Sequence, residues 1–266
     1  MYLHTPHSAF FQKRQLIYYR DLIRELVVRD LKLLYKRSML GVAWTLINPL
    51  LQLAVFAFVF QSILRVNVPQ YASFAFSGLL VWNWTQSSLF QATGLITSNR
   101  ALIRQPGFPI AVLPIVIVIT GLIHFLLALP VLLMFLVWDG ASLNLNFLFL
   151  PLLLLLQSLL TIGFAYPLAA LNVVFRDTQH TLGVILQLMF YLLPIFYTLE
   201  QVPDTLRGVY QLNPMVALLE AYRAILIRGV NPNGFALLML VLVIAGLLPI
   251  GYRIFKRQSQ RFVEEI

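Results

Sequence analysis

Charge is scarce in this chain of 266 residues: Asp, Glu, Lys and Arg make up 11% of it, while 60% of the residues are hydrophobic. A soluble domain usually carries about 25% charged residues. The chain therefore lacks the polar surface that water requires, and we expect its solvent to be lipid. Cysteine is absent altogether, which excludes a disulfide framework and a thiolate metal site.

Ionisable side chains are missing where ion transport or hydrolysis would need them. The six long apolar stretches contain no Asp, Glu, Lys or Arg. This argues against an ion-coupled transporter, whose relay uses titratable groups at membrane depth, and against a membrane-embedded hydrolase, which needs a paired acid and base. His124 is the ionisable group of note within these stretches, and we expect it to be a hydrogen-bonded core residue rather than a ligand.

Signals for nucleotide, nucleic acid and metal are also missing. No G-x-x-x-x-G-K motif occurs, so we expect no cofactor in this chain, and ATP with its magnesium would have to bind another subunit. The net charge of +9 comes without a basic patch interleaved with aromatic residues, so nucleic acid is not an expected partner. His4 and His7 have no third ligand nearby in the sequence, and no metal site is predicted.

Six apolar stretches are each long enough to cross a hydrocarbon core of ~30 Å. With the N-terminus inside, the cytoplasmic segments hold 15 of the 19 lysines and arginines, as the positive-inside rule requires. We predict an all-α polytopic membrane protein with both termini cytoplasmic, an N-terminal segment 1–39, a transmembrane domain 40–266 and a cytoplasmic tail 253–266. The six predicted transmembrane helices are 40–64, 74–97, 112–137, 147–171, 182–198 and 235–252.

An amphipathic segment precedes the first stretch. Its apolar residues fall on one helical face, and its basic residues fall largely on the other. This pattern predicts a helix that lies at the membrane surface. The apolar face comprises Ile23, Leu26, Val27, Leu31 and Leu34.

A short basic turn at 98–111, "SNRALIRQPGFPIA", joins the second and third stretches on the cytoplasmic side. Arg100 and Arg104 lie four residues apart, on one face of a predicted short helix. Pro106 and Gly107 are expected to end that helix. A plain topological marker would explain the arginines but not a helix followed by a stop.

The outer segment 199–234 contains "NPMVALLEAYRAILIRG", with Asn213 as a cap, Pro214 at the first helical position and Gly229 past the end. The helix that this predicts is ~22 Å long, which is short for a crossing. We predict two short helices that dip into the outer leaflet, the first starting near Pro203. The alternative is a helix on the outer surface.

Uncharged polar and aromatic residues recur at helical spacing in the first, second and fifth stretches. Lipid cannot satisfy the polar groups, so they face protein or water. They either hold helices together or line a conduit for a polar cargo, and both roles remain open. We also expect Pro194 to kink the fifth helix. The candidate lining residues are Trp44, Asn48, Gln52, Asn83, Gln86, Ser87, Phe90, Gln187 and Tyr191.

Five segments occur in an order that resembles a known family: "YKRSMLGVAWTLINPL", "SGLLVWNW", "NRALIRQPGFPIAVLP", "ALNVVFRDTQH" and "LNPMVALLEAYR". Together they resemble the membrane subunit of bacterial ABC transporters that export polysaccharides such as O-antigen, capsule or wall teichoic acid. The resemblance covers nearly the whole chain. It implies a homodimer of this chain with two ATPase subunits in the bacterial cytoplasmic (inner) membrane, moving a lipid-linked polysaccharide.

The same resemblance implies roles for individual residues. The segment from about Arg20 to Arg37 corresponds to an interface helix, with Arg24, Arg29, Lys32 and Lys36 on its basic face. The turn corresponds to a coupling helix that docks into the ATPase. The implied coupling residues are Arg100, Ala101, Leu102, Ile103, Arg104 and Gln105, with Arg176 and Asp177 nearby on the cytoplasmic side. The implied outer gate residues are Pro203, Asn213, Pro214, Glu220 and Arg223.

Two rival functions remain. A drug or lipid efflux permease of the related branch would share the architecture with different cargo. A polytopic transferase acting on lipid-linked sugars would instead need acidic residues that converge on one face. Its candidate acids, all predicted outside, are Asp139, Glu200, Asp204 and Glu220.

Overall fold

The computed structural model describes residues 7–36, 38, 40–141 and 144–262, with side chains from residue 14 onward. Within these ranges the protein is built from helices and connecting turns, as the all-α prediction expects. The elements in chain order are α1 (His7–Tyr35), η1 (Gly41–Ala43), α2 (Trp44–Ala57), η2 (Phe58–Ile63), α3 (Tyr71–Ser98), α4 (Arg100–Ile103), α5 (Val112–Trp138), η3 (Leu145–Phe149), α6 (Leu150–Val174), α7 (Thr178–Leu192), η4 (Leu199–Gln201), α8 (Asp204–Leu212), α9 (Pro214–Arg223), η5 (Ala224–Arg228) and α10 (Gly234–Ser259).

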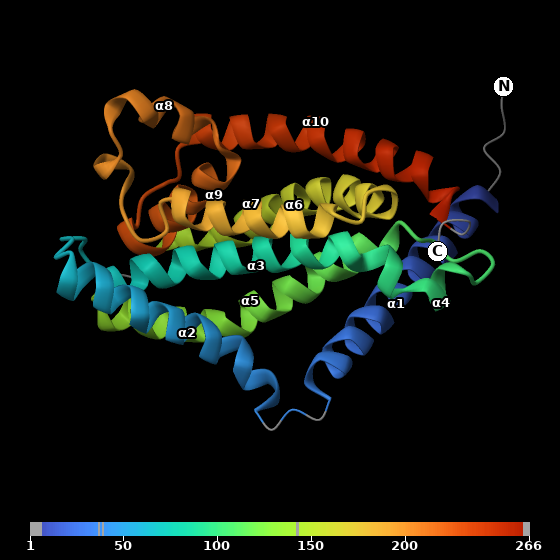
Figure 1. Ribbon diagram of the computed structural model, residues 1–266, viewed down its shortest axis with the longest axis horizontal. Helices are drawn as coiled ribbons and strands as arrows, with labels where there is room; N and C mark the ends of the chain where they lie inside the picture. The colour runs from blue at the N-terminus through green and yellow to red at the C-terminus, as the bar shows by residue number, and fades with distance from the viewer. Residues whose placement is uncertain (1–6, 37, 39, 142–143, 263–266) are drawn as a thin grey trace.

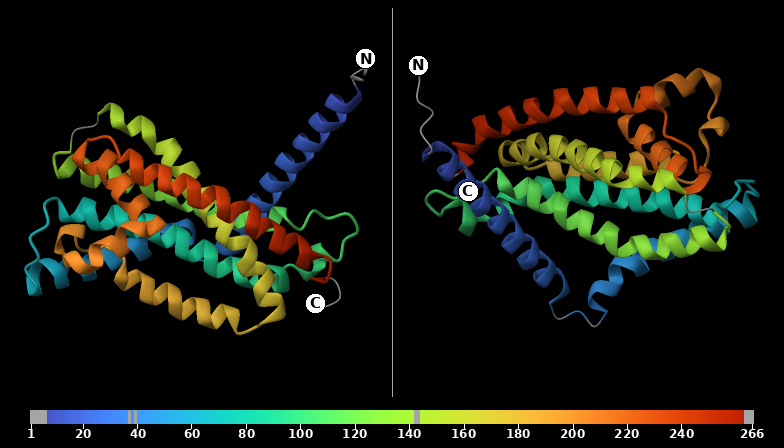
Figure 2. Two further views of the ribbon diagram at one scale, coloured as in Figure 1. Left: turned by 90° about the horizontal axis from the view of Figure 1, so that it is seen from above. Right: turned by 180° about the vertical axis from the view of Figure 1, so that it is seen from behind.

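The long helices form an elongated bundle around α3 (Figure 1). α3 packs against α5 on one side and α6 on the other, and α10 packs along α6. α1 and α4 lie at one end of the bundle, where α10 also ends, and α8 lies at the opposite end. α1 projects from the bundle axis in the view from above (Figure 2).

The centre of the bundle is packed where α3 meets α5. Gly121 of α5 faces Trp84 and Ser88 of α3, and a Cβ at Gly121 would lie 2.4 Å from Trp84 Cδ1 and 2.7 Å from Ser88 Oγ. Only glycine leaves room at this position for the Trp84 ring and the Ser88 hydroxyl to pack against α5. The Trp84 indole also donates a hydrogen bond to the Val118 carbonyl of α5 at 3.1 Å, which joins the two helices a second time.

Four helical stretches of the described chain are long and apolar enough to cross a membrane: Gly41–Ile63, Val112–Trp138, Leu145–Val174 and Gly234–Ser259. They match the first, third, fourth and sixth predicted spans. The second predicted span falls within α3, which has 28 residues but carries many small and polar side chains, several of them buried. Six crossings therefore remain a prediction, as does the placement of both termini.

The fifth predicted span differs from the structure. The helix expected over 182–198 is α7, which begins at Thr178 and ends at Leu192 after 15 residues. Pro194 therefore follows the helix and does not kink it. The cause is local, because a proline disfavours helical geometry in the residue before it, and Leu193 is extended, with φ −71° and ψ 144°.

The two short helices predicted for the outer segment are present as α8 and α9. Asn213 caps α9 by accepting a hydrogen bond from the Met215 amide at 2.9 Å, and Pro214 is the first helical residue. A π-helical turn, η5, continues α9 to Arg228, and Gly229 ends it with a φ of +65°. Their depth in a membrane remains a prediction.

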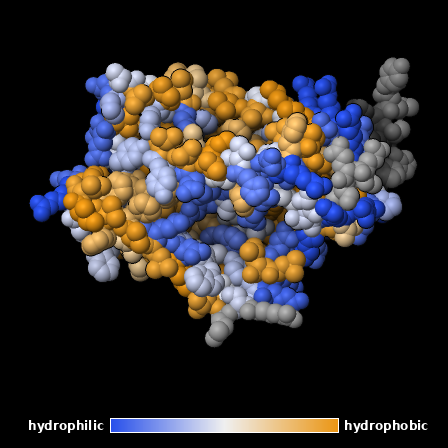
Figure 3. All heavy atoms as spheres, in the orientation of Figure 1, coloured by the Kyte–Doolittle hydropathy of each residue, from blue (hydrophilic) through white to orange (hydrophobic). Residues whose placement is uncertain are grey.

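The surface is uneven in polarity (Figure 3). Hydrophobic residues cover much of the bundle, and hydrophilic residues gather near α1 and α4. A further group of hydrophilic residues interrupts the hydrophobic surface in the middle of the face shown.

Candidate functional site

A cavity of about 770 Å³ is formed by α2, α3, α5 and α7. This volume is in the range of pockets that enclose drug-sized ligands. Eight of the nine residues predicted from helical spacing line it together, and Tyr191 does not. The eight are Trp44, Asn48, Gln52, Asn83, Gln86, Ser87, Phe90 and Gln187.

Some amide side chains in the cavity wall are hydrogen-bonded to other protein groups, and others are not. Asn83 donates to the side-chain oxygen of Gln52 at 3.0 Å, so one amide pair links α3 to α2. Among the described residues, the side chains of Asn48, Gln86 and Gln187 form no hydrogen bond with the protein. One set therefore holds helices together while the other is free for a ligand, so the two roles left open by the sequence both have candidates.

His124 lines the same cavity and has a partner from outside it. Its Nε2 is hydrogen-bonded to the Tyr35 hydroxyl of α1 at 2.9 Å, and the two rings meet edge to face with centroids 6.0 Å apart. His124 is thus hydrogen-bonded, as expected, and it also lines the cavity, which was not foreseen. Sequence reasoning did not identify Tyr35 at all.

The amphipathic helix is present but longer than predicted, since α1 begins at His7. Leu26 and Val27, from the predicted apolar face, are each 5% exposed in a core cluster with residues of α3, α4 and α5. Leu34, assigned to the same face, is exposed. Arg24, Lys32 and Lys36 are exposed, and Arg37 lies outside the described residues.

Arg29 of α1 contacts the turn 98–111, called the coupling turn below after the role predicted for it. Its guanidinium donates to the Asn99 side-chain oxygen at 3.1 Å and to Asp30 at 2.7 Å. Asn99 separates α3 from α4 and has non-helical backbone angles, with φ −109° and ψ 31°. The turn is therefore held against α1 at the point where the chain leaves α3.

The coupling turn itself contains a helix of four residues, α4, which ends at Ile103, three residues before Pro106 and its neighbour Gly107. Gly107 has a φ of +79°, the left-handed conformation that favours glycine. Ile103 is 3% exposed and anchors the turn in the core. The outward-facing residues are Arg100, Ala101, Arg104 and Gln105, and Leu102 is half-buried.

Arg176 and Asp177 lie in the turn between α6 and α7 and are exposed. Asp177 also borders a second, largely apolar cavity of about 340 Å³ between α6 and α7. Contact of these two residues with the coupling turn remains a prediction.

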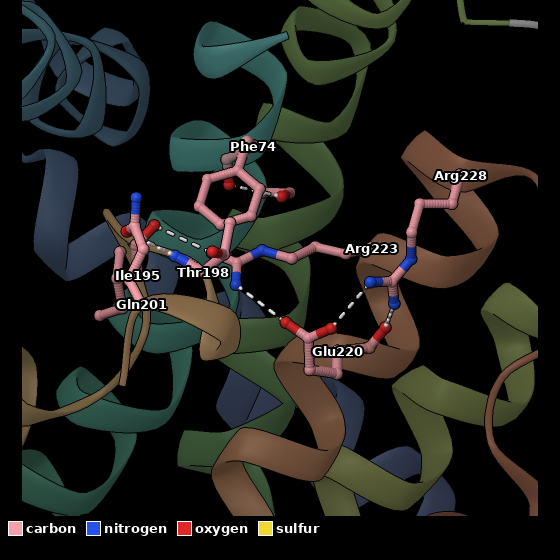
Figure 4. A network of polar contacts seen from close by, with 8 residues as sticks. Phe74, Ile195, Thr198, Gln201, Glu220, Arg223 and Arg228 are labelled. Atoms are coloured by element: carbon pink, nitrogen blue, oxygen red, sulfur yellow. Dashed lines mark hydrogen bonds and ion pairs between the residues drawn. The ribbon is translucent and has the colours of Figure 1, made fainter. Parts of the chain in front are cut away.

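A buried arginine organises the outer segment (Figure 4). Arg223 is 1% exposed and donates to the Ile195 carbonyl at 2.9 Å and to Glu220 at 3.2 Å. Its guanidinium carbon lies 3.5 Å from the centre of the Phe74 ring, a cation–π contact with α3. Burial lowers the pKa of Arg223 to about 10 and the Glu220 carboxylate opposes this, so the side chain stays charged at neutral pH.

Glu220 holds two arginines at once. It accepts from Arg223 on one oxygen and from Arg228 on the other, at 3.2 and 3.0 Å. Of the remaining predicted gate residues, Pro203 precedes α8, and Asn213 and Pro214 begin α9. Sequence reasoning assigned Glu220 and Arg223 to the gate but did not identify Phe74 or Ile195 as their partners.

Three of the four acidic residues that a transferase would need have side-chain partners, while the side chain of Glu200 is exposed. Asp139 accepts from the hydroxyl of Ser73 at 2.6 Å, Asp204 pairs with Arg207 at 2.9 Å, and Glu220 is held by its two arginines. Within the described ranges no group of three His, Cys, Asp or Glu residues could hold a metal ion.

Known proteins resemble the chain over nearly its full length. Residues 21–227 match the family described as ABC-2 type transporter. The O-antigen export system permease protein RfbA of Myxococcus xanthus is 36% identical, covering 95% of this chain and 98% of that protein. A Klebsiella pneumoniae protein of the same name is 32% identical over 95% and 97%. The polysialic acid transport protein KpsM of Escherichia coli is 24% identical over 90% and 93%.

Proposed function

The chain belongs to the ABC-2 type transporter family, and from that premise we propose that it is the permease subunit that exports a lipid-linked polysaccharide of the O-antigen type. The observation that carries this proposal is the 36% identity to an O-antigen export permease across 98% of that protein's length. It is a multi-pass membrane protein that works with a separate ATPase. We place it in the bacterial cytoplasmic membrane.

The arrangement that fits this function is a homodimer of the chain with two ATPase subunits. One copy has too few long helices to enclose a path for a sugar chain, whereas two copies related by a twofold axis can enclose one. The amide-lined cavity then forms part of that path. Polar walls are needed because each unpaired hydroxyl in hydrocarbon costs several kcal/mol.

ATP binding closes the ATPase pair, which pushes on the coupling turn. Two contacts support transmission of this movement into the permease: Ile103 is buried in the core, and Asn99 is hydrogen-bonded to Arg29 of α1. The outward-facing Arg100 and Arg104 are the docking residues. The lipid end of the cargo enters sideways near α1 and the first span, and α8 and α9 gate the outer end.

The proposal is tested with the double variant Arg100→Glu, Arg104→Glu, co-expressed with the ATPase subunit. We expect loss of complex formation or of export. The matched control is Arg253→Glu, Arg257→Glu, which makes the same charge change on exposed residues near the end of α10. A turn variant that binds the ATPase and exports like the wild type would show that the turn is only a topological marker.

A second candidate cargo is an anionic capsule polymer. It is supported by the 24% identity to the polysialic acid transport protein. Polysialic acid carries a carboxylate on each repeat, so such a polymer and a neutral glycan call for different cavity chemistry.

A further inference from the structure

The lining of the cavity contains no carboxylate, lysine or arginine, and its titratable residue is His124, which is hydrogen-bonded to Tyr35. The helices α2, α3, α5 and α7, which are described over their full lengths, contain no Asp, Glu, Lys or Arg. Three walls each present an amide with no protein partner in the described chain: Asn48 on α2, Gln86 on α3 and Gln187 on α7. The aromatic rings of Trp44 and Phe90 stand beside them.

These side chains match the surface of an uncharged sugar. A side-chain amide donates two hydrogen bonds and accepts two, and a hydroxyl both donates and accepts. Amides on three walls can therefore bond to sugar hydroxyls that point in different directions. Aromatic rings present flat apolar faces to the C–H faces of the sugar ring. Asn48 and Gln187 are exposed residues of the cavity lining, so a ligand can reach them.

A polyanionic polymer requires a different wall. Paths that conduct anions or phosphate are lined by arginine or lysine, because a charge removed from water without a counter-charge costs far more than a hydroxyl. Arg223, which packs on α3, cannot supply this counter-charge, because it is 1% exposed and already donates to Glu220 and Ile195.

We infer that the cavity selects an uncharged, hydroxyl-rich glycan over a polymer that carries a carboxylate on each repeat. The inference rests on the proposed export function and names the class of cargo for it. The choice between a neutral glycan and an anionic polymer thus depends on the chemistry of the cavity lining and not on sequence identity to relatives.

The experiment compares three lipid-linked polymers of one length and backbone in proteoliposomes that contain the permease and its ATPase. The first is a neutral hexose polymer, the second is the same polymer oxidised at C6 to uronic acid, and the third is the methyl ester of the second. The ester restores neutrality while it keeps the bulk at C6. We expect the neutral polymer and its ester to cross at similar rates and the uronic acid form to be slower by about tenfold or more.

Each other result has a defined meaning. A uronic acid polymer that crosses as fast as the neutral one overturns the inference. An ester that is as slow as the acid also overturns it, because shape at C6 and not charge is then selected. Failure of all three polymers to cross overturns the export function itself, and the inference with it.

A variant pair tests the same point from the protein side. Gln187→Lys places a cation in the cavity, and Gln187→Met is a matched uncharged change of similar size. We expect the lysine variant alone to raise the rate for the uronic acid polymer relative to the neutral one. Equal ratios in the two variants would overturn the assignment of this wall to cargo selection.

Discussion

The hydroxyl of Tyr35 in α1 lies 2.9 Å from Nε2 of His124 in α5, so the amphipathic N-terminal helix is hydrogen-bonded to a residue that lines the cavity. Two turns earlier, Arg29 of the same helix donates to Asn99 at the start of the coupling turn. One helix therefore contacts both the turn that is to dock on the ATPase and the wall of the proposed conduit.

Replacing Tyr35 by Phe tests this connection. The variant keeps the ring and loses the hydroxyl, so we expect a destabilisation of about 0.5–1.5 kcal/mol together with ATP hydrolysis that continues while export falls. The measurements are thermal unfolding of the purified complex and the ratio of export to ATP hydrolysis. Tyr18→Phe, on an exposed part of α1, is the control. An unchanged ratio in Tyr35→Phe would mean that the contact only holds the helix in place.

The outer segment gives a matched pair of arginines. Arg223 and Arg228 bind the same carboxylate of Glu220, but their side chains are 2% and 51% exposed. Arg223→Met should cost about 1–3 kcal/mol, because it leaves the Ile195 carbonyl without its charged donor and Glu220 with Arg228 alone. Arg228→Met should cost about 0–1 kcal/mol, as expected for a surface pair.

The measurement is the free energy of unfolding, or the midpoint of thermal unfolding, in one detergent for both variants. Arg223→Lys is included because lysine keeps the charge but not the planar group over Phe74. Equal losses for the Met variants at 223 and 228 would contradict the structural role given to Arg223.

Helix packing gives a third prediction. Gly121→Ala places a methyl group 2.4 Å from the indole of Trp84, so the indole or the helix must shift, and we expect a loss of about 1–3 kcal/mol with a change in cavity shape. Gly246→Ala, in α10 with open space around it, should be neutral or slightly stabilising because alanine favours helix. Thermal unfolding of the two variants side by side checks the pair, and similar midpoints would rule out the close approach.

The elements that sequence reasoning located well are those with local signals. Asn213, Pro214 and Gly229 mark the two ends of one helix through capping and backbone preferences that act within a few residues. The cavity face was found by periodicity, because residues three and four apart share one side of a helix. Eight of the nine residues chosen this way line one cavity.

The features that were missed depend on contacts between distant parts of the chain. Tyr35 and His124 are 89 residues apart, and nothing local in either segment indicates the bond. Arg223 looks like a charge on a short outer helix, yet its ring partner Phe74 is supplied by α3. The fifth span was predicted to extend too far because the sequence stays apolar past Leu192. The helix ends there because Pro194 disfavours helical geometry in Leu193.

The central claim is that cargo passes through the cavity, and site-specific cross-linking during export tests it most directly. A photoreactive residue is placed at Gln86, which lines the cavity, or at Leu242, which is exposed on α10 away from it. With the ATPase, ATP and a lipid-linked glycan present, the account predicts cross-links to the glycan at Gln86 that require ATP, and none at Leu242. Export that proceeds without a cross-link at Gln86, or with equal cross-links at both positions, would contradict it.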